Sequence, residues 1–172
     1  EGPDDAGHRG WIWQDDHDGN GKSLELIHPE ISNEYGKNWG ASVPDQGTPG
    51  TVNSIVVADI APLILDLVQS PIIPRATDPV TVTVRLIDEF LSVVSANVHW
   101  RVDGAVTFNT VPLIDSGRHG DGDAGDGVYG AVLPPQPDGT MVEYYLESSD
   151  TAGHTHTWPS ATQPSGQQQD AH

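Results

Sequence analysis

Apolar and polar residues alternate in several short segments of the second half of the chain. Between residues 80 and 86, valine or leucine takes every second position, and threonine or arginine takes the positions between them. Residues 98–102 and 142–147 show the same period of two. Because successive side chains of a β-strand point to opposite faces, this pattern predicts strands with one face toward a core. Trp100 lies in one of these segments and is expected to be a central core residue.

Seven segments with strand-like patterns are predicted to form one domain. They are residues 64–68, 80–88, 95–102, 107–114, 128–133, 141–149 and 154–158. Turn residues separate them, and the 19 glycines and 14 prolines are spread along the chain without a convincing amphipathic helix. About seven short strands at this spacing indicate an immunoglobulin-like or fibronectin type III-like β-sandwich. We therefore predict an all-β chain with a sandwich over residues 55–160 and a polar tail over residues 161–172.

Residues 1–54 differ from this domain, because they are largely irregular and carry three tryptophans, Trp11, Trp13 and Trp39. One strand is expected here, over residues 23–27. Aromatic rings offer flat apolar faces, and nearby carboxylates can accept hydrogen bonds from sugar hydroxyls, so a carbohydrate-stacking platform is one interpretation. The favoured interpretation is that the tryptophans fill the core of a small region with few other large residues.

The strongest candidate for a ligand site is the run at residues 115–129. It holds four aspartates and five glycines and then becomes an apolar strand. Closely spaced carboxylates repel one another unless a cation or solvent screens them, so the run predicts a calcium site. The predicted ligands are Asp115, Asp121, Asp123 and Asp126. One alternative is a glycine-rich hairpin whose aspartates serve as turn residues, and a weaker one is a transition-metal site that includes His119.

A second acidic segment resembles the start of a calcium-binding EF-hand loop. Asp16, Asp18 and Asn20 take the first, third and fifth positions, and a glycine takes the sixth. However, Ile27 stands at the twelfth position, where a bidentate glutamate belongs, and flanking helices are missing. A hairpin turn is the better interpretation, and a lower-affinity calcium site at these residues is the alternative.

The composition narrows the class of protein. The chain has 25 acidic and 7 basic residues and a net charge of −18, which would repel nucleic acid and an anionic membrane. It has no cysteine, so disulfides, catalytic thiols and zinc thiolate sites are excluded. No apolar run of about 18 residues predicts a membrane span. The chain starts without a signal peptide or an initiator Met, and a processed or excised fragment is expected.

Catalytic motifs give little support to an enzyme. The sequence has no Gly-x-Ser-x-Gly elbow, and its aspartates lie in glycine-rich turns rather than in apolar segments that would raise a carboxyl pKa. The eight histidines are scattered, although His154 and His156 would share one face of a strand and could bind a metal together. A Ser-His-Asp triad formed by distant residues stays an alternative.

The first part of the chain resembles the C-terminal half of a lamin-tail domain. The residues that carry the resemblance are Asp18 to Ile27, Asn38 with Trp39, and Thr48 to Asn53. In bacterial lamin-tail domains this string closes a small immunoglobulin-like sandwich. The resemblance covers about a quarter of the chain, and the family's N-terminal strands would lie before residue 1. It implies a partial lamin-tail-like β unit over residues 1–54.

The second part is similar to the immunoglobulin-like modules that follow lamin-tail domains in large secreted bacterial proteins. Residues 98–104, 115–129, 138–145 and 150–154 carry this similarity. It implies an accessory module of surface proteins, adhesins or exported hydrolases. We therefore predict a non-enzymatic structural, adhesion or assembly module, extracellular or on the bacterial cell surface and stiffened by calcium.

The predicted partners follow from the partial first domain. A homo-oligomer or another chain would complete its sheet by adding a strand, as in a surface polymer or a multichain complex. The alternative function is a carbohydrate-binding accessory module of an exported hydrolase, with a glycan bound at the tryptophans.

Overall fold

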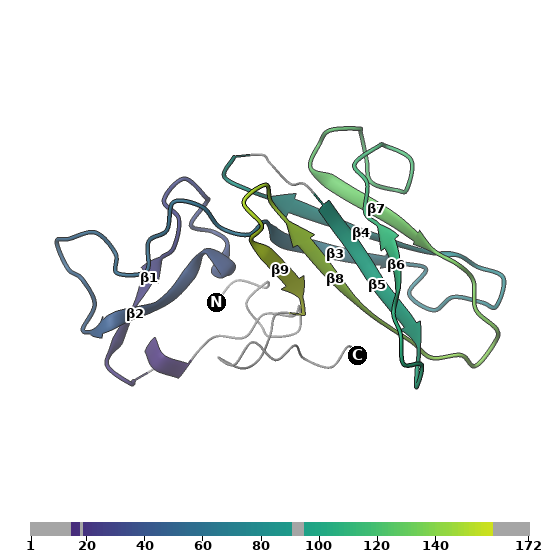
Figure 1. Ribbon diagram of the computed structural model, residues 1–172, viewed down its shortest axis with the longest axis horizontal. Helices are drawn as coiled ribbons and strands as arrows, with labels where there is room; N and C mark the ends of the chain where they lie inside the picture. Colours follow the sequence, from purple (N-terminus) through teal and green to yellow (C-terminus); the bar gives the residue numbers. More distant parts are fainter. Residues whose placement is uncertain (1–14, 18, 91–94, 160–172) are drawn as a thin grey trace. The chain divides into compact units, whose positions relative to one another are not determined.

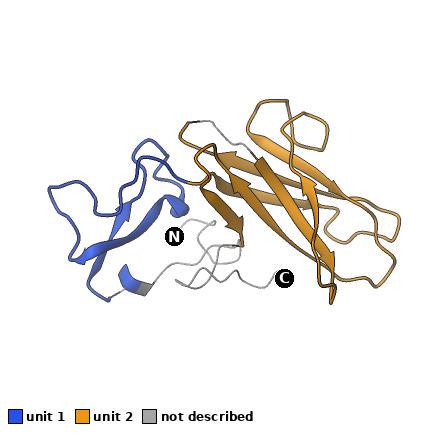
Figure 2. Cartoon of the chain, in the orientation of Figure 1, with its two compact units in different colours: residues 1–60 blue, residues 61–172 orange. Residues whose placement is uncertain are grey.

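The computed structural model describes residues 15–17, 19–90 and 95–159. The chain divides into two compact units, residues 1–60 and residues 61–172 (Figure 2). The boundary places residues 55–60 with unit 1, where the Val57 N–H donates to the Ile27 carbonyl at 3.1 Å. The predicted tail at residues 161–172 and the predicted sites at Trp11, Trp13 and Asp18 lie outside the described residues.

Unit 1 is built around a two-stranded antiparallel sheet (Figure 1). Its elements are the 3-10 helix η1 (Asp15–His17), strand β1 (Lys22–Leu26), the 3-10 helix η2 (Gly36–Asn38) and strand β2 (Trp39–Asp45). Leu24 pairs with Ala41, and Leu26 pairs with Trp39. Strand β1 confirms the predicted strand, whereas β2 was not predicted.

The interior of unit 1 is polar. Glu25 is 4% exposed, and its carboxylate accepts hydrogen bonds from the Thr48 hydroxyl and from the Ser54 N–H and hydroxyl. The Thr48 hydrogen bond is the main cause of the lowered pKa of Glu25. Asn38 is fully buried: its amide accepts from the His28 N–H and donates to the carbonyls of His28 and Ile31. Side-chain hydrogen bonds therefore stabilise this interior, whereas apolar packing stabilises most protein cores.

Unit 2 is an immunoglobulin-like β-sandwich of two antiparallel sheets (Figure 1). The first sheet has the order β3-β4-β7, formed by Leu63–Ser70, Val80–Ile87 and Val128–Leu133. The second has the order β6-β5-β8-β9, formed by Asn109–Pro112, Ser95–Val102, Val142–Ser149 and Thr155–Trp158. The all-β fold and the sandwich predicted from the sequence are confirmed.

The core of unit 2 lies between the two sheets. In β4 the predicted alternation holds, because Val82, Val84 and Leu86 are buried while Thr81 and Thr83 are half-buried. The buried side chains of the cluster are Ile64, Val82, Val84, Leu86, Ala96, Val98, Leu113, Ala131, Leu133 and Leu146. Trp100 packs against this cluster from one side and is only half-buried, so it is not the central core residue that was expected.

Helical structure is confined to η1 and η2 in the described part of the chain. None of its helices has the length and apolar character that a membrane crossing requires.

Candidate functional sites

The aspartate- and glycine-rich run forms a closed loop beside β7. An antiparallel bridge between Ile114 and Gly130 joins its two ends, with N–H···O distances of 3.0 Å in both directions. All five glycines of the run have positive φ, from 72° to 85°. This backbone conformation favours glycine over residues with a Cβ atom, so the glycine spacing dictates how tightly the loop can fold.

Asp121 is the centre of this loop. Its side chain is fully buried, and its carboxylate accepts hydrogen bonds from three backbone amides: Ser116 at 2.7 Å, Gly117 at 3.0 Å and His119 at 2.7 Å. The bond from the Ser116 amide is the largest cause of a pKa lowered to about 2, and burial, which acts in the opposite direction, is outweighed. Asp121 is therefore ionised at neutral pH and holds the first half of the loop.

Two further carboxylates hold the second half of the loop. Asp115 accepts from the amides of Gly125 at 2.5 Å and Gly127 at 2.9 Å. Asp126 accepts from the amides of Asp123 at 3.0 Å and Val128 at 2.9 Å. Backbone N–H groups thus supply the positive partial charges that sequence reasoning assigned to a cation.

Calcium binding in the loop stays a prediction, and the donor set fits it in part. A carboxylate has further lone pairs beyond those used here, and Asp123 is exposed. Calcium needs six to eight oxygen ligands. However, the described residues of unit 2 bring no three carboxylate or histidine ligand atoms of this loop within 4.8 Å of one another. Any cation would have to draw on backbone carbonyls and water.

Two glycines determine how closely the loop packs. A Cβ atom on Gly122 would lie 2.4 Å from a carboxylate oxygen of Asp126. A Cβ atom on Gly130, in the middle of β7, would lie 2.7 Å from the carbonyl oxygen of His119. Both distances are shorter than real Cβ contacts. A larger residue at Gly130 would push the loop away from β7, whereas one at Gly122 would displace the Asp126 carboxylate within the loop.

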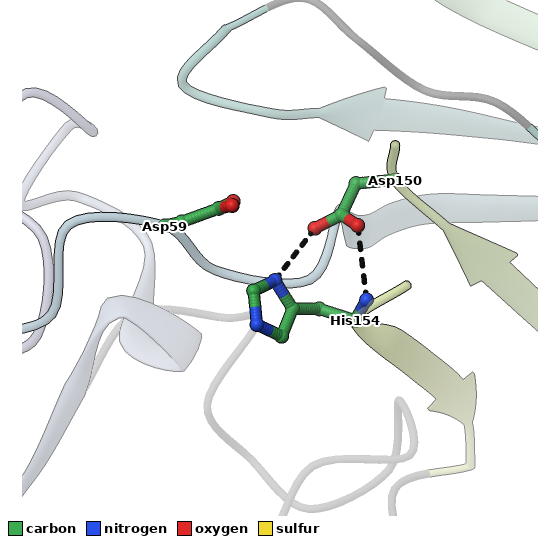
Figure 3. Close-up of side chains that lie close together, drawn as sticks. All are labelled: Asp59, Asp150 and His154. Atoms are coloured by element: carbon green, nitrogen blue, oxygen red, sulfur yellow. Dashed lines mark hydrogen bonds and ion pairs between the residues drawn. The ribbon is translucent and has the colours of Figure 1, made fainter. Parts of the chain in front are cut away.

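A second buried aspartate stabilises the turn between β8 and β9 (Figure 3). The side chain of Asp150 is 1% exposed, and its carboxylate accepts from the amides of Gly153 at 2.7 Å and His154 at 2.9 Å. The ring Nδ1 of His154 lies 2.9 Å from the other carboxylate oxygen. Burial acts to raise the pKa of Asp150, but these interactions outweigh it and the net shift is downward.

A pocket of about 240 Å³ opens at one end of the sandwich. Trp100 and Tyr144, which pair across β5 and β8, form part of its wall. The segments at residues 74–78 and 134–140 form the rim. The pocket was not predicted from the sequence. The alternation in residues 98–102 and 142–147 does place Trp100 and Tyr144 at inward-facing positions, and it was the available signal that they could lie close together.

Comparison with known families agrees with this fold. Residues 82–158 match the family model described as conditioned medium factor 2nd Ig-like domain. The matched segment of this Ig-like domain runs from β4 to β9 and includes both the Asp121 loop and the Asp150 turn. No curated protein matches the chain.

The remaining predicted site residues lie outside the Ig-like domain, in unit 1. Asp16 and Asn20 are exposed, at η1 and at the turn before β1. Trp39 is half-buried at the start of β2, and its indole N–H donates to the Asn33 carbonyl at 2.9 Å. With the neighbouring residues Trp11, Trp13 and Asp18 outside the described part, the carbohydrate platform and the weaker calcium site stay predictions.

Proposed function

We propose that this chain is a non-enzymatic structural module of an extracellular or cell-surface bacterial protein. The observation that supports this best is that the acidic loop residues bind backbone amides of their own loop. Asp115, Asp121 and Asp126 each bind two or three backbone amides of their own loop. Asp121, whose pKa these bonds lower, is a poor general acid at neutral pH, because a catalytic acid needs a raised pKa.

Unit 1 supports an assembly role for the module. In β1 the polar Glu25 is buried while Leu24, which points to the opposite face, is 37% exposed. Val43 in β2 is 67% exposed. Each of the two strands has an edge that pairs with no other strand among the described residues. A two-stranded sheet alone is marginally stable, so a further strand from a second copy or another chain would complete it.

Self-association tests this role. We expect sedimentation velocity to show concentration-dependent association, and hydrogen exchange to show greater protection of the β1 and β2 amides as the associated fraction rises. Leu24→Glu would weaken association by at least tenfold, whereas Val106→Glu, at a 93% exposed position in unit 2, would leave it unchanged. A chain that stays monomeric at millimolar concentration would contradict the assembly role.

Calcium stiffening of the Asp/Gly loop is the second part of the proposal. A ligand that binds only the folded state raises its stability by mass action, so chelation would lower the unfolding midpoint. Asp123 gives the sharper test, because its carboxylate accepts no hydrogen bond from the described residues. In the Asp123→Asn variant, chelation would no longer lower the unfolding midpoint. If chelation has no effect on the unsubstituted chain, the loop is stabilised by its amide bonds alone.

A further inference from the structure

The pocket at the end of the sandwich continues the space between the two sheets. Val80 at the start of β4 and Leu133 at the end of β7 line it from one sheet, and Val142 of β8 lines it from the other. All three side chains belong to the inward-facing series that forms the core farther along the same strands. Strand residues thus line one part of this volume of about 240 Å³, and the loops at residues 74–78 and 134–140 line the rest.

Two aromatic rings form the wall on the side of β5 and β8. Trp100 and Tyr144 are directly opposite each other in the antiparallel register, and both are half-buried. Their rings are therefore partly accessible from the pocket. The Tyr144 phenol donates to the Gln69 side chain of β3 at 3.2 Å, and burial raises its pKa further above physiological pH.

One polar group in this wall has no hydrogen-bond partner among the described residues. The indole Nε1 of Trp100 is buried and makes no hydrogen bond to any described residue. An unsatisfied buried donor costs about 1–3 kcal/mol relative to a paired one, so native structures rarely leave one without a partner. The Nε1 atom has almost no accessible surface, so a ligand reaches it only if neighbouring side chains of the pocket wall move.

The rim adds charged and hydroxyl groups. Arg75 is exposed on one side, and Asp138 and Thr140 lie on the other. The Arg75 guanidinium makes no ion pair with the described residues, whereas Arg85 and Arg101 are paired with Asp66 and Glu143. Arg75 is thus a cationic donor at the pocket mouth in a chain whose net charge is −18.

We propose that this pocket binds one sugar unit at the end of a glycan. Sugar rings combine a weakly apolar face, which suits the walls formed by Trp100 and Tyr144, with several hydroxyls that both donate and accept. The Arg75 guanidinium would donate to ring hydroxyls, and Asp138 would accept from them. The volume lies below the roughly 300–1,000 Å³ typical of sites for drug-sized molecules, so it favours a single ring over a longer ligand.

This site differs from the tryptophan platform considered for residues 1–54, and it does not depend on the assembly role. A module that is monomeric could still bind a sugar here. A module that assembles could still have an empty pocket.

Titration with free monosaccharides tests the proposal. The ¹⁵N-labelled full chain would be titrated with glucose, galactose, mannose and N-acetylglucosamine. At least one sugar is expected to bind with a dissociation constant of the order of 1 mM, and to shift the Trp100 indole N–H resonance saturably. Amides of residues 74–78 and 134–140 would shift with the same midpoint.

Three variants identify the site, with circular dichroism and the unfolding midpoint as checks of the fold. Trp100→Phe keeps a ring but reduces the aromatic face of the wall, and is expected to weaken binding at least threefold. Arg75→Ala would weaken it at least threefold with no change in the fold, because Arg75 is exposed. Arg118→Ala, at another exposed arginine in the Asp/Gly loop, is the matched control and would leave binding unchanged.

Three outcomes would overturn the proposal. One is the absence of saturable shifts at Trp100 with every sugar. Another is sugar binding that Arg75→Ala and Trp100→Phe both leave unchanged, which would place the sugar elsewhere. The third is saturation by a hexaproline peptide in the absence of any sugar binding, which would identify the pocket as a peptide site.

Discussion

The two units stabilise their interiors in different ways, unit 2 by apolar packing and unit 1 mainly by side-chain hydrogen bonds. In unit 2 the alternation of apolar and polar residues directs valine, leucine and isoleucine inward, and the sheets close over an apolar cluster. In unit 1 the same period of two directs Glu25 inward and leaves Leu24 partly exposed. The alternation therefore reports which side chains share a face, but not which face is buried. Hydrogen bonds to Glu25 and Asn38 replace apolar packing in unit 1.

The largest effect is expected from the apolar core. Leu146 is fully buried in β8, so Leu146→Ala would remove transfer free energy and leave a cavity, at a cost of about 2–5 kcal/mol in the unfolding of unit 2. Chemical denaturation and amide hydrogen exchange would measure this loss. Ile73→Ala, at an 87% exposed position, is the control and would change stability by less than about 0.5 kcal/mol. Equal losses in unit 1 amides would show that the units unfold together.

A smaller effect is expected from the polar core of unit 1. Asn38→Ala would leave the His28 amide and the carbonyls of His28 and Ile31 without their partner, at a cost of about 1–3 kcal/mol. Hydrogen exchange should show lost protection at His28, with unit 2 amides unaffected. Asn33→Ala, an exposed site in the same loop, serves as the control. If both substitutions had the same small effect, side-chain hydrogen bonds would not hold unit 1 together.

The smallest effect, and the most pH-dependent one, is expected from the Asp/Gly loop. The pKa of Asp121 is about 2 in the folded chain, against an ordinary value of 3.8. A depressed pKa stabilises the fold above the ordinary value, and this contribution is lost as the pH falls from about 4 toward 2. Asp121→Asn would therefore lower the melting temperature by about 5–10 °C at pH 7 and by much less at pH 2.

Thermal unfolding from pH 7 to pH 2 measures this difference. Asp123→Asn is the matched control, because the Asp123 carboxylate is exposed, and its melting temperature would follow that of the unsubstituted chain at every pH when no divalent cation is present. A difference between Asp121→Asn and the unsubstituted chain that stayed constant down to pH 2 would show that the Asp121 charge does not stabilise the loop.

Regular alternation made most of unit 2 predictable. Residues 80–86 alternate regularly, and the strand expected there is β4, which runs from Val80 to Ile87. Strand β2 has small and polar residues at many positions and shows no such alternation, so its strand depends on pairing with β1 and escaped prediction. The expected strand at residues 107–114 shortens to Asn109–Pro112. The Leu113 N–H still donates to the Ala96 carbonyl of β5 at 2.8 Å, but Ile114 bridges to Gly130 of β7 instead.

The candidate sites were less predictable for a physical reason. The same aspartates and glycines can surround a cation or bind the amides of their own loop, and only the fold shows which oxygens meet which donors. The Trp100 pocket depends on how far the loops at residues 74–78 and 134–140 stand from the strand ends. Sequence reasoning placed Trp100 inside the sandwich but had no information on that separation.

The hydrogen bonds of Asp121 also bear on how the chain resists proteolysis. Arg118 is exposed and is a potential cleavage point for trypsin-like enzymes. The amides of Gly117 and His119, one on each side of it, both donate to the Asp121 carboxylate. Proteolysis generally proceeds through an opened form of the chain, so cleavage after Arg118 would wait for these bonds to break. A loop that exposes its basic residue would thus resist digestion without a disulfide.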